Sequence, residues 1–99
     1  MIFVTAQPES LNAAADKLAA IGSILAAQRA VTAAPMTGVV PAAADDVSMT
    51  TAVKFAAHAQ AFQAVSAQAA AMHELFVSTL QTSAGSYAAT EVANAAATR

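Results

Sequence analysis

The stretch FAAHAQAFQAVSAQAAAMHELFVSTL, residues 55–80, carries the clearest periodic pattern in the chain. Its larger side chains recur every seven residues, with a second set three residues further on: Phe55, Phe62, Ala69 and Phe76, followed by His58, Val65 and Met72. Steps of three and four place residues on one face of a helix and are typical of helices that pack as in a coiled coil. The stretch therefore predicts a long helix that packs against another helix.

A similar pattern precedes this stretch, over residues 8–33. Leu11, Leu18 and Leu25 recur every seven residues, with Ala14 and Ile21 between them, and a second stripe passes through Lys17, Ile24 and Val31. Pro8 suits the first turn of a helix, where its missing N–H is harmless, and Glu9 suits the positive end of the helix dipole. These features predict a first helix over about residues 8–33.

Proline and glycine predict where the helices stop. Pro35, Gly38 and Pro41 indicate a turn over residues 34–41, and Gly85 is the next helix-breaking residue. The second helix is therefore expected over about residues 42–82, with Asp45 and Asp46 in its first turns, where the helix dipole favours acidic residues. We predict an all-α antiparallel two-helix hairpin over residues 1–84 and a C-terminal tail over residues 85–99.

The unequal lengths of the two helices predict a partner. At about 1.5 Å per residue the helices measure roughly 39 and 60 Å. A tight turn would place residue 8 near residue 67, so that residues 68–80 project roughly 20 Å beyond the first helix. The apolar side chains on that projection are Met72, Leu75, Phe76, Val77 and Leu80. The segment Ile2–Val4 is long enough to cover only part of them.

An exposed apolar surface of this extent indicates a protein interface. We therefore predict a helical partner that completes a four-helix bundle. The pattern leaves open which apolar residues pack within the hairpin and which face the partner. The candidates for the partner interface are Leu11, Leu18, Ile21, Leu25, Phe55, Phe62, Val65, Met72, Phe76 and Leu80.

Charge and composition argue against several other classes of protein. The chain has a net charge of −2 and only four scattered Lys and Arg residues, so we expect no nucleic-acid binding. It contains no cysteine, which excludes disulfides and thiolate metal sites. The sequence has no run of about 18 consecutive apolar residues, so we predict no integral membrane segment. The N-terminus lacks a basic residue and a long enough apolar run for a secretory signal peptide.

The residues that could support catalysis or metal binding do not form a recognisable site. His58 and His73 lie fifteen residues apart, whereas a metal pair on a helix needs a spacing of three or four. Asp45 and Asp46 are adjacent and so point about 100° apart on a helix, which suits a helix start better than an acid pair. No nucleophile elbow or phosphate-binding glycine loop is present. We therefore predict no enzyme activity, no metal and no cofactor.

Tyr87, the only tyrosine, precedes Glu91 by four residues in the C-terminal stretch SAGSYAATEVANAAA. By spacing alone this pattern is too loose to separate a frayed tail from a functional motif. If the tail is helical, a step of four places both side chains on one face.

The chain as a whole resembles the PE family of mycobacteria, which is named for a Pro-Glu pair near its N-terminus. Pro8-Glu9 matches that pair, after an opening Met1-Ile2-Phe3-Val4 that differs from the usual Met-Ser-Phe-Val only at Ile2. The stretch TGVVPAAADDVS, residues 37–48, residues 55–80 and the C-terminal stretch also resemble the family, with Asp46 where glutamate is common. The similarity covers residues 1–97 and is closest to the short PE proteins, which lack a glycine-rich or enzymatic extension.

The resemblance implies a partner, an export route and a role. PE proteins form helical hairpins that pair with a longer PPE protein through a four-helix bundle. The pair is exported by a type VII (ESX) secretion system, with an EspG-type chaperone bound mainly to the PPE subunit. Tyr87 and Glu91 match the family's export motif of a tyrosine, three residues and an acidic residue. The resemblance therefore implies a PE subunit that stabilises its partner and is secreted or held on the cell surface.

Two alternatives use the same apolar faces. One is a self-associating surface or cell-envelope protein, and the other is a membrane-inserting component of the secreted pair. A membrane-surface helix usually carries Lys and Arg on its polar face, whereas this one has Gln60, Gln63, Gln68 and Glu74 with only Lys54.

Overall fold

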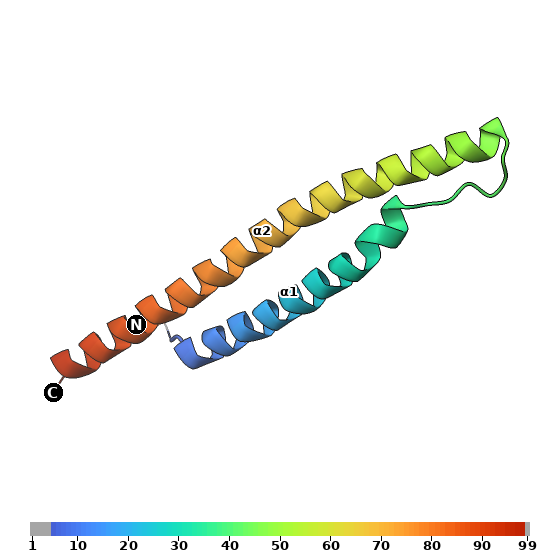
Figure 1. Cartoon of the computed structure of the whole chain (residues 1–99). Coiled ribbons are helices and arrows are strands. Elements are labelled where there is room, and N and C mark those ends of the chain that lie inside the picture. Colours follow the sequence, from blue (N-terminus) through green and yellow to red (C-terminus); the bar gives the residue numbers. More distant parts are fainter. Residues whose placement is uncertain (1–4, 99) are drawn as a thin grey trace.

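The chain folds as a hairpin of two long helices. The computed structural model describes residues 5–98, so the predicted covering segment Ile2–Val4 lies outside the described residues. Helix α1 spans Pro8–Thr37 and helix α2 spans Asp46–Ala97, and residues 38–45 connect them (Figure 1). The molecule measures 81 × 23 × 16 Å. The described residues contain no strand, which confirms the predicted all-α class and two-helix hairpin.

Helix α1 is longer than predicted because it continues through Pro35. Its start is as expected, with Pro8 in the first turn and Glu9 beside it. At its end, the Gly38 N–H donates to the Ala34 carbonyl at 2.9 Å. Proline lacks an N–H but has a helical φ, so near the end of a helix it removes a single backbone hydrogen bond without stopping the chain. The predicted end near residue 33 was therefore wrong by about one turn.

Helix α2 begins later than predicted, at a side-chain cap. The Asp45 carboxylate accepts hydrogen bonds from the Ser48 backbone N–H at 2.8 Å and from the Ser48 hydroxyl at 3.0 Å. These bonds lower the pKa of the Asp45 carboxyl below its ordinary value of 3.8. An N-cap aspartate has extended backbone angles and fixes the start of the helix at the next residue. The predicted start near residue 42 was thus wrong, whereas the position of Asp45 and Asp46 at the helix start is confirmed.

Helix α2 also passes through Gly85 without a break. Glycine in a helix interior costs about 1 kcal/mol relative to alanine, and the surrounding sequence is rich in alanine, which favours helix most. None of the described glycines has a positive φ, so Gly85 does not form the left-handed turn that commonly ends a helix. The predicted end near residue 82 was wrong, and residues 85–97 continue the helix.

The two helices meet along a narrow line of mostly small side chains, which we call the hairpin seam. On α1 it consists of the buried or half-buried residues Pro8, Leu11, Ala15, Leu18, Gly22, Arg29 and Met36. On α2 it consists of Ala52, Ala56, Ala59, Gln63, Ser66, Ala70, His73, Val77, Leu80 and Ala84. On α2 these residues alternate in steps of four and three, as predicted for a helix pair, and on α1 they do so as far as Gly22 and then continue in steps of seven. On α2, however, the seam lies one residue after the phenylalanines, which is about 100° around the helix.

Three contacts across the seam fix its register. His73 Nε2–H donates to the Leu18 carbonyl at 2.7 Å, and its ring lies against Gly22. Further along, Arg29 Nη1 donates to the Ser66 carbonyl at 3.4 Å. Residues 22 and 29 are thus level with residues 73 and 66, and the same register places Pro8 level with Tyr87.

The predicted register, with residue 8 near residue 67, was wrong by about twenty residues. Residues 38–45 do not form a tight turn but run beside the first turns of α2, where Val39 and Val40 line a small pocket with Thr51 and Phe55. This connection shifts α2 relative to α1. Residues 68–80 therefore lie alongside α1 and do not project. Helix α2 extends past both ends of α1, with residues 46 to about 57 beyond the end of α1 and the residues after about 87 beyond its start (Figure 1).

The seam makes a prediction for two glycines in different surroundings. A Cβ added at Gly22 would lie 3.0 Å from His73 Cδ2, whereas one added at Gly85 would meet nothing within 4 Å. Gly85→Ala should therefore stabilise the helix by about 0.5–1 kcal/mol. Gly22→Ala should gain as much in helix propensity. It should also displace the His73 ring and its hydrogen bond, which costs about 1–3 kcal/mol and outweighs that gain. Urea titrations followed by circular dichroism will compare them, and equal effects would contradict the seam.

Candidate protein-binding surface

Helix α2 presents its largest side chains beside the hairpin seam and not within it. Phe55, Phe62 and Phe76 each come one residue before a seam residue, and all three are more than half exposed. Val65 and Met72 lie three residues further along the same side and are 63% and 70% exposed. The prediction that these residues form the packing stripe of a helix is thus correct in its period, but this stripe does not pack on α1.

Helix α1 adds to the same side of the hairpin. Ile21 comes one residue before the seam residue Gly22. Ile24 and Val31 follow Ile21 by three and ten residues and continue its stripe along the helix. Two antiparallel right-handed helices that face each other turn such preceding positions to the same side. We call this side the apolar face, made of Ile21, Ile24, Val31, Phe55, Phe62, Val65, Met72 and Phe76, all of them exposed.

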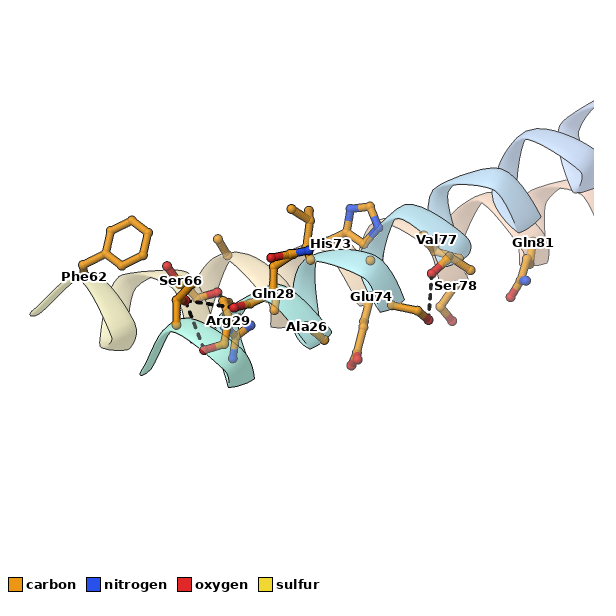
Figure 2. A pocket seen from close by; sticks show the side chains of 17 residues that line it. Ala26, Gln28, Arg29, Phe62, Ser66, His73, Glu74, Val77, Ser78 and Gln81 are labelled. Carbon is orange, nitrogen blue, oxygen red and sulfur yellow. Dashed lines mark hydrogen bonds between the residues drawn. The ribbon is translucent and has the colours of Figure 1, made fainter. Parts of the chain in front are cut away.

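The opposite side carries small or polar side chains and is called the polar face. Its residues follow the seam positions by one, and among them are Asp16, Ser23, Gln60, Ala67, Glu74 and Gln81. Figure 2 shows Glu74 and Gln81 directed away from the side on which Phe62 lies. The hairpin therefore has two unlike faces, and only one of them is rich in large apolar groups.

The size of the exposed surface indicates that the hairpin does not bury its apolar groups by itself. Its accessible surface is 7609 Å², whereas a compact monomer of 9.9 kDa exposes about 5,200 Å². The radius of gyration is 22.9 Å, against about 13 Å for a compact chain of this length. The buried apolar residues of the described chain are mainly alanines, with Val77 the largest. Such a core gives little hydrophobic stabilisation, because alanine buries little apolar area.

The predicted interface residues divide between the seam and the apolar face, except for Leu25, which lines the cleft between the helices. Leu11, Leu18 and Leu80 are half-buried in the seam and pack within the hairpin. The other seven are exposed: Ile21, Leu25, Phe55, Phe62, Val65, Met72 and Phe76. Ile24 and Val31, which were predicted only as a second stripe, are 62% and 72% exposed and belong to the apolar face. The seven-residue spacing of Ile24 and Val31 is the sequence signal that could have placed them on this face.

Tyr87 and Glu91 lie on the last turns of α2. Both are exposed, and both continue the spacing of the seam, since Tyr87 follows Leu80 and Glu91 follows Ala84 by seven residues. Because α1 starts level with Tyr87, the motif occupies the seam side of α2 where the helix passes the start of α1. The helical step places both side chains on one face, as expected for a helical tail. Buried Pro8 and exposed Glu9 lie at the same end of the hairpin.

A cleft of about 810 Å³ runs between the helices in the middle of the hairpin (Figure 2). Arg29, His73 and Glu74 are the charged or titratable residues among those that line it. The Arg29 Nε is buried and has no hydrogen-bond partner within residues 5–98. Within those residues no group of three or more His, Asp or Glu side chains is placed to hold a metal ion. The cleft therefore contains a buried N–H donor, the Arg29 Nε, that lacks an acceptor. Its described residues form no cluster of metal ligands.

One of the two described helices also has the length and composition of a membrane span. Helix α1 contains an 18-residue window with a mean hydropathy of 1.2, and none of that window is buried in the hairpin. The window meets this criterion through its alanines, although polar residues interrupt it. The prediction that the chain has no integral membrane segment stays a prediction.

The fold and its surfaces define an elongated helical-hairpin protein with a small-residue seam, one unpartnered apolar face and an exposed Tyr-x-x-x-Glu motif at one end. A sequence model of the PE family matches residues 4–94, so the chain belongs to the PE family. The resemblance to this family, based on Pro8-Glu9 and the C-terminal stretch, is confirmed.

Curated relatives come from mycobacteria. The chain is 64% identical over 97 residues to PE family protein PE13 of Mycobacterium tuberculosis, covering 98% of each chain. It is also 54% identical over 96 residues to the M. tuberculosis protein PE_PGRS8, covering 97% of this chain and 55% of that one. The identity to PE_PGRS36 of the same species is 55% over 95 residues, but there the chain spans only 19% of the relative's length.

Proposed function

We propose that this chain is the PE subunit of a secreted heterodimer, in which its apolar face packs against a PPE-family protein. The observation that carries this proposal is the exposure of Phe55, Phe62 and Phe76 beside a seam whose buried apolar residues are mainly alanines. Burying one such side chain is worth about 1.5–3 kcal/mol, so a partner that covers the face stabilises both proteins.

The dimensions of the apolar face favour a partner with two helices. From Phe55 to Phe76 the face extends about 32 Å along α2, and it is two helices wide where Ile21, Ile24 and Val31 of α1 lie level with about residues 64–74. A single added helix would cover one stripe and leave the other in water. A second helical pair covers both, which gives the four-helix bundle of the proposed heterodimer.

The proposed export signal is the Tyr87–Glu91 motif. It lies at one end of the hairpin and outside the apolar face, so a bound partner would leave it accessible to the type VII secretion machinery. An EspG-type chaperone would bind the PPE subunit, and the exported pair would be secreted or held on the mycobacterial surface. The subunit would then have a structural and targeting role and no enzymatic one.

Co-expression tests the heterodimer. We expect the chain to be insoluble or poorly folded alone, and to form a soluble 1:1 complex with its cognate PPE protein. Gel filtration with light scattering gives the stoichiometry, and PPE proteins encoded in the same genome are the candidates. A stable, monodisperse protein purified without any partner would exclude the proposal and favour a self-associating surface protein.

The hydropathy of α1 supports a second candidate function, a membrane-inserting component of the exported pair. Its 18-residue window has the mean hydropathy of a weak membrane span. Flotation of the purified complex with lipid vesicles, at low and at high salt, tests this candidate. Insertion would resist high salt, whereas a complex that stays with the soluble fraction would exclude it.

A further inference from the structure

We propose that two copies of this chain associate through their polar faces, with Arg29 of each copy paired to Glu74 of the other. This contact goes beyond the proposed heterodimer, since it uses the opposite side of the hairpin. It would bring two heterodimers together into a 2:2 assembly.

The first observation is that Arg29 is incompletely bonded within its own chain. Its side chain is half-buried in the seam, and its one hydrogen bond among the described residues is to the Ser66 carbonyl at 3.4 Å. Its Nε is buried without an acceptor. A guanidinium has five N–H donors, and a buried donor without an acceptor is destabilising. The buried Nε cannot be reached from outside, but the terminal N–H groups of the guanidinium that Ser66 does not bind are available to an acceptor on another chain.

The second observation is the position of Glu74, the one carboxylate that lines the same cleft. It lies eight residues beyond Ser66 on α2, or about 12 Å along the helix, so it is too far to pair with Arg29 of its own chain. In Figure 2 Arg29 and Glu74 extend to the same side of the helix pair, away from Phe62. The cleft therefore carries an anion on the polar face and, in the seam, a half-buried cation that extends to the same side.

These two charges are complementary to those of a second copy. Ala70 lies midway between Ser66 and Glu74, so the cation and the anion are each about 6 Å from that level. Consider a twofold axis that lies in the interface at this level, perpendicular to the helices. It places the second copy antiparallel to the first. Its Glu74 then faces Arg29, and its Arg29 faces Glu74. Such a self-complementary patch is what an isologous dimer requires.

The side chains around this centre allow the copies to approach closely. Ser23, Ala26, Ala67 and Ala71 lie on the polar face near the proposed axis, and all are exposed. Small side chains permit close packing of helices, and both charges can then reach across the interface. A second copy is therefore the occupant that the charges and the shape of this face fit.

The experiment uses the chain co-expressed with its PPE partner. We expect a mass of two heterodimers by light scattering, and a dissociation constant for their association that rises at least about tenfold for Arg29→Glu or for Glu74→Arg. The double variant should restore association, because it exchanges the two charges at both ends of the interface. Lys54→Glu is the matched control for the change in net charge, and it should associate like the wild type.

Cross-linking provides a second measurement, since the chain has no cysteine. Ala71→Cys lies close to the proposed axis and should form a disulfide between two copies under mild oxidation, whereas Ala57→Cys, further along the polar face, should not. A 1:1 complex that stays a single heterodimer at high concentration and forms no such disulfide would overturn the proposal. Failure of the wild type to bind any PPE protein would instead exclude the heterodimer. In that case, formation or absence of the Ala71→Cys disulfide in the chain expressed alone would test the contact between two copies.

Discussion

Phe62→Asp should abolish the complex with the PPE partner without removing any contact of the hairpin seam. Phe62 lies at the middle of the apolar face and is 53% exposed in the isolated hairpin. In the proposed bundle it would be buried. The substitution removes about 1.5–3 kcal/mol of hydrophobic stabilisation and places an unpaired carboxylate in the interface, which costs several kcal/mol more. We expect the affinity to fall by a factor on the order of a thousand or more.

The control for this substitution is Leu75→Asp. Leu75 is 69% exposed and lies on the side of α2 that faces away from α1. Leu75→Asp therefore introduces the same apolar-to-acidic change on the same helix, but outside the proposed interface. Co-expression of each variant with a tagged PPE protein, followed by co-purification and quantification of the bound chain, compares the two. If Leu75→Asp disrupted the complex and Phe62→Asp did not, the partner would bind another side of the hairpin.

The sequence predicts the number of helices and their period, because seven-residue spacing of apolar groups is a property of the helix itself. The antiparallel arrangement also follows, since a short connection leaves no other choice. What the spacing does not predict is which stripe packs inside the chain. Phe62 and Phe76 have the size of core residues, yet Ala59, Ala70 and Ala84 form the contact with α1.

The reason is that alanine allows two helices to approach closely, whereas phenylalanine keeps them apart. A hairpin that packs through alanine keeps its large side chains for another surface. A rule that places the largest apolar residues in the core therefore assigns the wrong face in this hairpin. In the proposed heterodimer these residues would become buried against the partner.

The helix ends and the register could not be predicted because they depend on small energy differences. Gly85 costs only about 1 kcal/mol in a helix, so its alanine-rich neighbours decide that the helix continues. The register depends on whether residues 38–45 form a tight turn or an extended connection, and the Asp45 cap selects the later start of α2. These outcomes move Tyr87 from a presumed tail onto the helix and bring it level with Pro8.

Tyr87→Ala should block export while leaving the complex with the PPE protein intact. Tyr87 is 49% exposed and lies on the last turns of α2, away from the apolar face. Its loss should therefore remove a recognition contact without affecting the bundle. Secretion of a tagged PE–PPE pair into the culture medium, measured against its level in the cells, should fall at least about tenfold. Glu91→Ala should act in the same way, whereas Val92→Ala, one residue away on another side of the helix, should be exported normally.

Helical geometry gives this prediction a sharper form. If the machinery reads Tyr87 and Glu91 on one face of α2, inserting one alanine between residues 88 and 89 rotates Glu91 by about 100° and should block export although both residues remain. Inserting seven residues there restores the face but lengthens the spacing by about 10.5 Å, and should also fail. Normal export of the single-alanine insertion would show that the motif is read as an extended segment. Loss of the complex on Tyr87→Ala would instead identify Tyr87 as a packing residue, since a residue that only carries the signal has no part in holding the two chains together.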